Sequence, residues 1–307
     1  MASTVGSVLR LSIFGQSHSP AIGCSLDGLP AGIPIDIAQL ERFLERRAPG
    51  RSKTATMRRE ADTPRIIAGI TDGHTNGAPF AAMIENGDTR SQDYDELRRI
   101  PRPGHADYPA WIKYRNWHDV AGGGHFSGRL TAPLCIVGGI ALQALEGMGI
   151  HIAAHIAELG PQPCVDSRLN DHSWDEAQTR AILEHQLPCI DEGAADDMYA
   201  AIMEAKNELD SLGGIVECAA YGVPAGVGDP MFDGIENRVA RLAFGIPAVK
   251  GVEFGAGFGV ARLHGSENND PYRMEGGRVT ASSNRAGGVL GGITTGLPLV
   301  FRAAFKP

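Results

Sequence analysis

One part of this chain repeats another, and the repeat limits the folds that the chain can adopt. Residues 24–33 read CSLDGLPAGI and residues 218–227 read CAAYGVPAGV, so they share the cysteine, the first glycine and the Pro-Ala-Gly turn. An amphipathic pattern follows each copy and predicts helices over 36–47 and 233–244.

A second pair of segments repeats in the same order. TNGAPFAAMI at 75–84 and TTGLPLVFRA at 294–303 both place Thr and Gly before a proline that opens an apolar strand. Short turn motifs can recur by chance, but two matches in one order favour a duplicated unit of strand, turn, helix and returning strands. We therefore expect two similar halves related by a pseudo-twofold axis.

The remaining periodicity predicts a mixed fold in a single domain spanning residues 1–307. Strand patterns occupy 150–159 and 214–221, and helical patterns occupy 108–117, 126–148, 174–184 and 194–212. Because strands come in clusters, we expect an α/β (α+β) fold with antiparallel sheets flanking helices and not a doubly wound parallel sheet. GAGFG at 255–259 lacks the G-x-G-x-x-G spacing, so we reject a dinucleotide-binding fold.

The charge distribution excludes one class of function and indicates another. A net charge of −8 argues against general nucleic-acid binding, because phosphate backbones select a basic face. Between residues 42 and 59, however, only Glu45 opposes Arg42, Arg46, Arg47, Arg51, Lys53, Arg58 and Arg59. Arginine binds oxyanions through paired hydrogen bonds, so we expect this segment to hold a phosphate or carboxylate. A solvated helix end is the alternative, and an RNA contact is a more remote one.

The sequence predicts neither disulfides nor a metal nor a membrane span. Its five cysteines are widely spaced without a C-x-x-C pair, which fits a reducing compartment. His151 and His155 lie in a predicted strand, too far apart for a compact site, so no metal is expected. No signal-peptide pattern is present, and the most apolar stretch, 131–145, is too short to span a bilayer. We expect a soluble cytoplasmic protein.

Two histidines lie in turn-rich polar strings. His18 belongs to FGQSH at 14–18, and His105 belongs to RPGHAD at 102–107. Glycine and proline bend the backbone there, so each imidazole stands on a loop, and histidine titrates near neutral pH. A single such histidine is more often a structural hydrogen-bonding group, but the pair predicts residues that exchange protons.

Two glycine-rich strings are candidate ligand contacts. The glycines 122–124 precede the helix pattern of 126–148, so we expect phosphate or a flavin edge at the helix start, contacted by an exposed Arg129. Pro133 should kink that helix unless the helix starts later. Five glycines within 287–296 exclude bulk, which fits either a planar ligand or a crossing of strands.

Taken together, these strings resemble the chorismate synthase family over nearly all 307 positions. The matching strings are FGQSHS (FGESHG in the family), RRAPGRS, RSQDY at 90–94, RPGHADY at 102–108, GVPAG, KGVEFG at 250–255 and NRAGGVLGG running into Lys306-Pro307. The resemblance implies a β-α-β sandwich with antiparallel sheets around central helices, and a homotetramer. It also implies a lyase that eliminates phosphate from 5-enolpyruvylshikimate 3-phosphate in an anti-1,4 sense to give chorismate, with reduced FMN required but not consumed.

The resemblance also implies roles for individual residues. His18 would protonate the leaving phosphate, and His105 would protonate or hold the reduced flavin. Ser17 and Ser127 would lie beside them in a proton relay. The residues implied in substrate binding are Arg47, Arg51 and Arg129. Arg47 and Lys53 match positions linked to NADPH in members that reduce their own flavin. The implied flavin contacts are His125, Phe126, Ser127, Pro247, Ala248, Gly291, Lys306 and Pro307.

Two local departures from the family pattern change the chemistry of these strings. GGGHFSGRLT stands where the family has GGGRSSARET, so His125, Phe126 and Leu130 remove polar groups from the implied flavin wall. Gln16 and Ser19 replace Glu and Gly in the first histidine string, which deletes a negative charge beside the imidazole.

A third departure concerns the C-terminal end. Family members continue beyond the position of Pro307 into a serine-rich FMN-binding stretch, an arginine and an aspartate proposed as the base, so we expect a chain that is C-terminally short. The alternative function is a non-catalytic homologue that binds a phosphorylated shikimate-like ligand or acts as an assembly partner.

Overall fold

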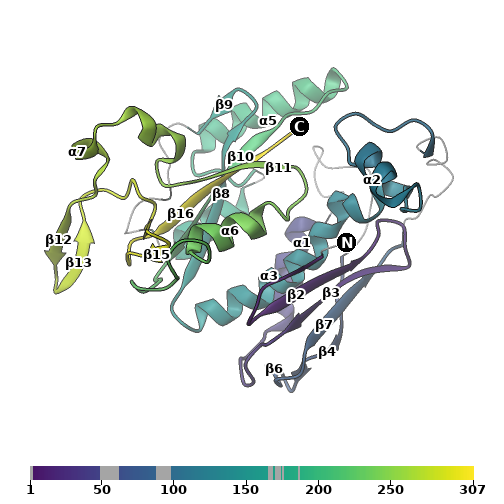
Figure 1. The fold of residues 1–307 in the computed structure, drawn as a ribbon, viewed down its shortest axis with the longest axis horizontal. Coiled ribbons are helices and arrows are strands. Elements are labelled where there is room, and N and C mark those ends of the chain that lie inside the picture. The colour runs from purple at the N-terminus through teal and green to yellow at the C-terminus, as the bar shows by residue number, and fades with distance from the viewer. Residues whose placement is uncertain are drawn as a thin grey trace. The chain divides into compact units, whose positions relative to one another are not determined.

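The computed structural model describes residues 3–48, 62–87, 98–164, 169, 174, 176–185 and 187–307. It divides into two compact units, Met1–Leu145 (unit 1) and Glu146–Pro307 (unit 2). In Figure 1 unit 1 runs from purple to teal, and unit 2 continues from teal through green to yellow.

Unit 1 is built on a five-stranded antiparallel sheet of order β1-β2-β3-β7-β4. Its strands are β1 (Thr4–Val5), β2 (Arg10–Gly15), β3 (Ala21–Asp27), β4 (Arg65–Ala68) and β7 (Phe80–Glu85). The hairpin β5 (Ile70–Thr71) and β6 (His74–Thr75) and the helices α1 (Ile37–Arg47), α2 (Asp107–Tyr114) and α3 (Thr131–Glu146) complete the unit.

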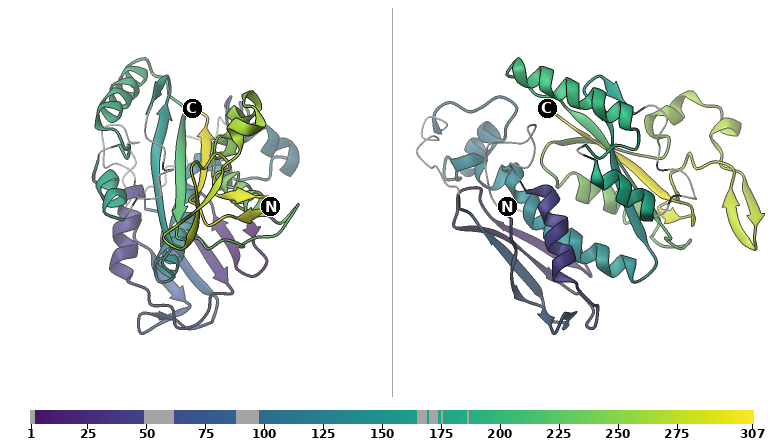
Figure 2. Two further views of the ribbon diagram at one scale, coloured as in Figure 1. Left: turned by 90° about the vertical axis from the view of Figure 1, so that its left-hand side faces the viewer. Right: turned by 180° about the vertical axis from the view of Figure 1, so that it is seen from behind.

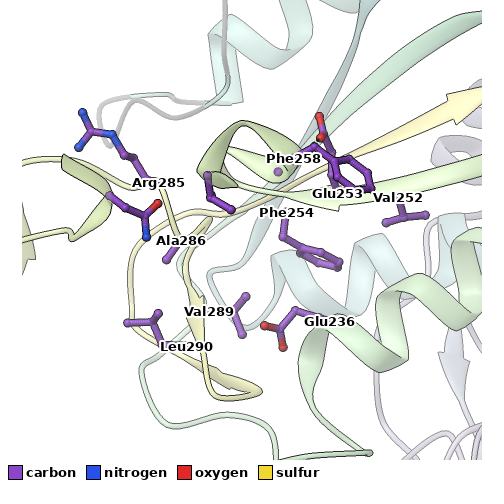
Figure 3. A pocket seen from close by; sticks show the side chains of 12 residues that line it. Glu236, Val252, Glu253, Phe254, Phe258, Arg285, Ala286, Val289 and Leu290 are labelled. Atoms are coloured by element: carbon purple, nitrogen blue, oxygen red, sulfur yellow. Dashed lines mark hydrogen bonds between the residues drawn. The ribbon is translucent and has the colours of Figure 1, made fainter. Parts of the chain in front are cut away.

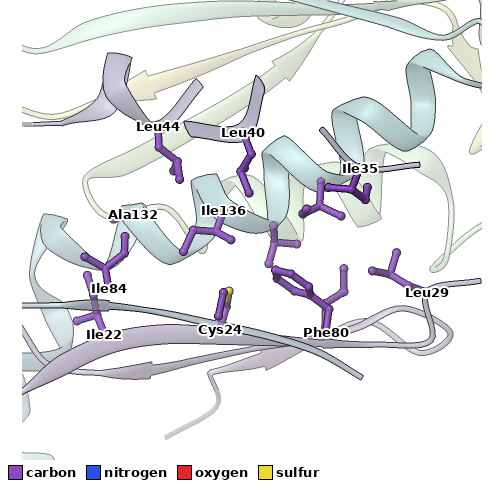
Figure 4. Packing of buried hydrophobic residues seen from close by; sticks show 14 of the residues in the cluster. Ile22, Cys24, Leu29, Ile35, Leu40, Leu44, Phe80, Ile84, Ala132 and Ile136 are labelled. Carbon is purple, nitrogen blue, oxygen red and sulfur yellow. The ribbon is translucent and has the colours of Figure 1, made fainter. Parts of the chain in front are cut away.

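The core of unit 1 lies between one face of this sheet and the helices α1 and α3. Figure 4 shows Leu40 of α1 and Ile136 of α3 above Cys24 and Phe80 of the sheet, and all four are fully buried. The two helices approach closely at Gly139, where a Cβ would lie 2.5 Å from a methyl carbon of Leu40. Truncating one such leucine to alanine typically costs about 2–5 kcal/mol, so this core fixes the scaffold of unit 1.

The helical stretch Gly128–Glu146 is the one candidate membrane span among the described residues, by length and composition only. It is longer than the apolar stretch expected from sequence, which corrects that expectation. Ala132, Ile136 and Ile140 on this stretch are fully buried in the core of unit 1, an arrangement typical of a soluble protein's central helix.

Unit 2 is built on a second five-stranded antiparallel sheet, of order β11-β16-β10-β8-β9. Its strands are β8 (His151–Leu159), β9 (Gln162–Pro163), β10 (Gly214–Tyr221), β11 (Val249–Phe254) and β16 (Leu299–Phe305). Its helices are α4 (Glu176–Glu184), α5 (Glu192–Asn207), α6 (Ile235–Ala243) and α7 (Gly265–Asn268). The hairpins β12 (Tyr272–Glu275) with β13 (Arg278–Ala281), and β14 (Val289–Leu290) with β15 (Ile293–Thr294), extend from it. In Figure 2, α5 lies along the sheet at β8 and β9.

The two units repeat one topology, which confirms the internal duplication. In chain order β2, β3, α1, β4 and β7 of unit 1 correspond to β8, β10, α6, β11 and β16 of unit 2. The registers agree as well, because Cys24 pairs with Ala82 in one sheet while Cys218 pairs with Phe301 in the other. These four positions are the ones that the sequence repeats align.

The repeat extends to individual hydrogen bonds. The hydroxyl of Thr75 donates to the carbonyl of Pro30 at 2.6 Å and accepts from the backbone N–H of Ile33 at 2.9 Å. The hydroxyl of Thr294 makes the matching bonds, at 2.7 Å to Pro224 and 2.9 Å from Val227. Each Pro-Ala-Gly turn is thus fastened to its returning strand by one threonine.

The observed elements confirm the α/β class with antiparallel sheets, and several boundaries differ from expectation, among them those of the helix expected over 108–117, which spans Asp107–Tyr114. The helix expected over 126–148 begins only at Thr131, because 122–126 turns through left-handed glycines, and the helix expected over 194–212 spans Glu192–Asn207. The helix expected over 174–184 spans Glu176–Glu184. A pseudo-twofold axis, the sandwich of the two sheets and a single domain over 1–307 stay predictions.

Candidate active site

The glycine turn 122–124 brings His18 and His105 to neighbouring positions in unit 1. All three glycines have positive φ, at 58°, 84° and 55°. A Cβ at Gly122 would lie 2.2 Å from Nδ1 of His18, and a Cβ at Gly123 would lie 2.8 Å from Nε2 of His105. Only glycine leaves room for both rings, so consecutive residues of one turn contact the two imidazoles.

A carboxylate orients the imidazole of His105. Nδ1 of His105 lies 2.5 Å from Oδ1 of Asp107, whose side chain is 6% exposed. Arg102 donates to both oxygens of that carboxylate, at 2.8 and 3.0 Å. Hydrogen bonding by Arg102 holds the pKa of Asp107 well below its usual range, against the opposing effect of burial. A charged acceptor favours a proton on Nδ1, which leaves Nε2 to face the glycine turn.

The loop that carries Ser17 and His18 is held by several backbone contacts. Ser17 is buried, and its N–H donates to the carbonyl of Gly124 at 3.1 Å. The amide of Asn86 donates to the carbonyls of Gln16 and Ser19 at 3.1 and 2.7 Å. The position of the first histidine is therefore set by the glycine turn and by the end of β7.

Two arginines in unit 1 share one buried carboxylate. Arg47 donates to Oδ2 and Arg129 donates to Oδ1 of Asp62, which is 2% exposed. Nε of Arg129 also donates to Asn86 at 3.3 Å, which links the group to the loop of His18. Two guanidinium groups on one carboxylate leave an excess of positive charge there, a setting suited to an anion. Arg129 is 5% exposed, so the expectation that it is an exposed residue is wrong.

The side chains of His125 and Phe126 both contact other residues of unit 1. Nδ1 of His125 lies 2.7 Å from the carbonyl of Gly15, and Nε2 lies 2.6 Å from the hydroxyl of Ser3. The ring of Phe126 lies 6.4 Å from that of Tyr114. The imidazole at 125 therefore ties the N-terminal strands to the glycine turn, and flavin contacts of these two residues stay predictions.

The start of α3 differs from the anion site expected there. The glycines 122–124 lie in a turn that ends before the helix and do not form its first turn. Ser127 caps the short 3₁₀ turn that follows, and its hydroxyl accepts from the N–H of Arg129 at 3.3 Å. Pro133 lies in the first turn of α3, where its missing N–H has no helical partner, so no kink is required.

Four predicted flavin contacts gather at one place in unit 2. The N–H of Lys306 donates to the carbonyl of Ala248 at 3.0 Å, so Pro247 and Ala248 lie beside Lys306 and Pro307. Ala248 has φ of 73°, an uncommon value for a residue other than glycine. Pro247 and Ala248 follow the C-terminal end of α6, and Lys306 and Pro307 follow β16.

Gly291 lies at the opposite end of α6. The next residue, Gly292, accepts from the N–H of Ile235 at 3.0 Å, the first residue of that helix. Nine residues of α-helix span about 13 Å, and Pro247 and Ala248 follow the far end of this helix. A Cβ at Gly291 would meet no atom within 4 Å, so its side is open to a ligand.

Other glycines of the C-terminal string serve a crossing of strands. A Cβ at Gly287 would lie 2.4 Å from the backbone nitrogen of Gly255, and one at Gly288 would lie 2.3 Å from the carbonyl oxygen of Pro298. Beside this crossing is a pocket of about 410 Å³ whose labelled residues in Figure 3 include Phe254, Val289 and Leu290. The structural alternative for this string is thus correct at Gly287 and Gly288.

Some predicted residues lie outside the described residues. They are Arg51, Lys53, Arg58 and Arg59 of the basic segment and the string at 90–94.

Sequence reasoning missed two carboxylates of the site. Asp107 lies in the RPGHAD string, and its position two residues after His105 was the feature that could have identified it as a partner of that histidine. Asp62 has no motif around it, and only the fold brings it to both arginines.

Comparisons with known proteins agree over nearly the whole chain. A family profile described as chorismate synthase matches residues 9–307. A chorismate synthase of Lancefieldella parvula is 45% identical, covering 100% of this chain and 83% of the relative. One of Thermococcus kodakarensis is 48% identical over 98% of this chain and 82% of the relative. A crystal structure of chorismate synthase superposes with a TM-score of 0.79 at 29% identity, covering 98% of this chain and 85% of the other.

Proposed function

The chain belongs to the chorismate synthase family, lyases of the shikimate pathway, and on that premise we propose its substrate, cofactor and catalytic groups. The substrate is 5-enolpyruvylshikimate 3-phosphate, and the products are chorismate and inorganic phosphate. The reaction is an anti-1,4-elimination, in which a carbon–oxygen bond breaks and a proton leaves the far end of the allylic system.

One observation supports this assignment most directly: the rings of His18 and His105 pack against the consecutive glycines Gly122 and Gly123. Phosphate is a better leaving group when an acid protonates it as the bond breaks. His18, beside the buried Ser17, is the proposed acid, and His105 is the group that holds a proton at its ring for the reduced cofactor. Ser17 and Ser127 are the proposed relay hydroxyls.

Arg47 and Arg129 are the proposed anion-binding groups of the site. Their shared carboxylate, Asp62, fixes both guanidinium groups before an anion arrives, which lowers the ordering cost of binding. Arg47 is the more exposed of the two, with 21% of its side chain accessible, so it is the better placed for direct contact. Arg51 completes the proposed substrate-binding set.

The backbone leaves space for a flavin at two places. A Cβ at Gly128, next to Ser127, or at Gly291 would meet no atom within 4 Å, so a planar group can approach the backbone at both places. When bound, reduced FMN supplies electron density to the allylic system. Its proposed contacts are His125, Phe126, Ser127, Pro247, Ala248, Gly291, Lys306 and Pro307. Arg47 and Lys53 are the proposed contacts of NADPH as a source of reducing equivalents.

The family also supplies the proposed assembly and location, a homotetramer in the cytoplasm. The chain spans about four fifths of the length of the curated relatives it matches.

Phosphate release under anaerobic conditions tests the proposal. The protein should release phosphate from 5-enolpyruvylshikimate 3-phosphate with reduced FMN and none with oxidised FMN. His18→Ala and His105→Ala should each lower release by at least about 100-fold, because each removes a proton-transfer group. His74→Ala is the matched control, an exposed histidine whose ring bonds its own turn, at 2.8 Å to the carbonyl of Asp72. Release that is independent of flavin reduction, or unchanged in both variants, would overturn the assignment.

A further inference from the structure

Three potential metal ligands meet inside unit 2. His155 lies in the middle of β8, Cys164 follows β9, and Cys189 precedes α5. One ligand atom of each lies within 4.8 Å of the other two, and all three residues are buried. These residues come from three separate segments, so only the fold brings them together.

The imidazole of His155 has no hydrogen-bond partner for either nitrogen within the described part of the chain. Its side chain is 0% exposed, so water does not satisfy the ring from the surface. Buried polar atoms are nearly always hydrogen-bonded, and an exception calls for an explanation such as a bound ion. A coordinate bond to a cation would satisfy one of these two nitrogens.

A buried carboxylate stands beside the same imidazole. Oε1 of Glu217 lies 3.5 Å from Nε2 of His155 and accepts from the N–H of Leu169 at 2.5 Å. Histidines that bind metals usually donate their second ring N–H to a carboxylate or carbonyl, which fixes the ring orientation. Glu217 is therefore placed as a positioning residue for this histidine.

The two thiols are in contact and protected from solvent. Cys164 and Cys189 hydrogen-bond to each other, and burial shields their thiol protons from solvent. A divalent cation displaces such protons, because a thiolate bound to a metal no longer bears its charge alone. The protons leave to solvent as the metal binds.

We propose that His155, Cys164 and Cys189 form a structural site for Zn²⁺, with Glu217 orienting the imidazole. Zinc prefers thiolate sulfur and imidazole nitrogen, and a Cys₂His set with one further ligand is an established coordination. The sequence-based expectation of no metal rested on the spacing of the histidines and on the lack of a C-x-x-C pair. Neither criterion detects ligands that only the tertiary structure brings together. The ion would join β8, the segment after β9 and the start of α5.

Cobalt substitution of the full reduced chain is the direct test. Co²⁺ added to metal-free protein should bind at about one ion per chain and give thiolate-to-cobalt charge-transfer bands with the intense visible bands of tetrahedral cobalt. Zn²⁺ should then displace the cobalt and abolish those bands. Failure of the reduced wild-type chain to give thiolate-to-cobalt bands would overturn the proposal without depending on any variant.

Variants identify the ligands. His155→Ala, Cys164→Ala and Cys189→Ala should each weaken Co²⁺ binding by more than about 100-fold, and Glu217→Gln by about 10- to 100-fold, the range typical of outer-shell partners. Cys24→Ala is the matched control, a fully buried cysteine in the core of unit 1, and should bind cobalt as the wild type does. Cobalt bands that persist in Cys164→Ala and Cys189→Ala, or a 164–189 disulfide in a chain that takes up no metal when reduced, would refute the site.

Discussion

Nδ1 of His105 lies 2.5 Å from Oδ1 of Asp107, and Arg102 donates to both oxygens of the same carboxylate. The arrangement fixes the ring and its proton before any ligand binds. It makes the histidine dependent on a carboxylate that the motif alone did not identify as a partner.

Asp107→Asn should lower kcat by roughly 100-fold while leaving the fold intact, because an amide no longer selects the proton position on His105. Steady-state phosphate release and circular dichroism measure the two effects. Asp233→Asn is the control, since Asp233 forms an equivalent two-point pair with Arg238 on the surface of unit 2. A kcat equal to that of the wild type would show that the carboxylate does not orient the ring.

Acid should remove stability through the same carboxylate. Because Arg102 depresses the pKa of Asp107 in the folded chain, its contribution is present above the unfolded pKa of about 3.9 and is lost as pH falls through the lower folded pKa. The free energy of unfolding of the wild type should therefore exceed that of Asp107→Asn near pH 6, and the difference should shrink below about pH 4. Urea titrations at a series of pH values measure this, and a difference that grows on acidification would contradict it.

Gly122→Ala and Gly123→Ala should each lower activity by more than about 10-fold, because the new methyl group would displace the ring of His18 or His105. Both positions have positive φ, so each change should also cost about 1 kcal/mol of stability or more. Gly276→Ala is the matched control, because its φ of 57° is as unfavourable for alanine as that of Gly122, while its Cβ would meet no atom within 4 Å. Full activity in the first two variants would mean that the turn does not position the histidines.

Asp62→Asn should destabilise unit 1 by about 3–5 kcal/mol, because it leaves two neighbouring guanidinium groups without their buried counter-charge. Thermal unfolding measures the loss. Asp27→Asn breaks an exposed pair with Arg10 and should cost only about 0–1 kcal/mol. Equal losses in the two variants would show that the buried carboxylate is not the anchor of the arginines.

The sequence was most informative where a local pattern and a tertiary contact coincide. Thr75 and Thr294 were aligned by sequence alone, and each closes the same turn in its own unit, because one hydroxyl bonds a carbonyl and an N–H of the Pro-Ala-Gly segment. The strand over 214–221 was predicted with the observed boundaries, since its alternation faces a core.

The sequence was less informative where burial or positive φ overrides local pattern. Arg129 was expected on the surface because it interrupts an apolar run, but Asp62 supplies a buried charge that no spacing reveals. The glycines 122–124 were expected to form an anion site at the start of a helix, while their positive φ values and the two imidazoles show a turn that contacts side chains. The metal ligands proposed in unit 2 come from three segments and carry no motif.

A kinetic cycle over His18→Gln, His105→Gln and the double variant tests most directly the central claim that both imidazoles serve one turnover. Phosphate release with reduced FMN would be measured as kcat/KM for all four proteins. If both rings act on the same elimination, each single variant should lower kcat/KM by at least about 100-fold, and the double variant should be no more active than the less active single variant. Wild-type release by either single variant, or a double variant that is more active than a single one, would contradict the account.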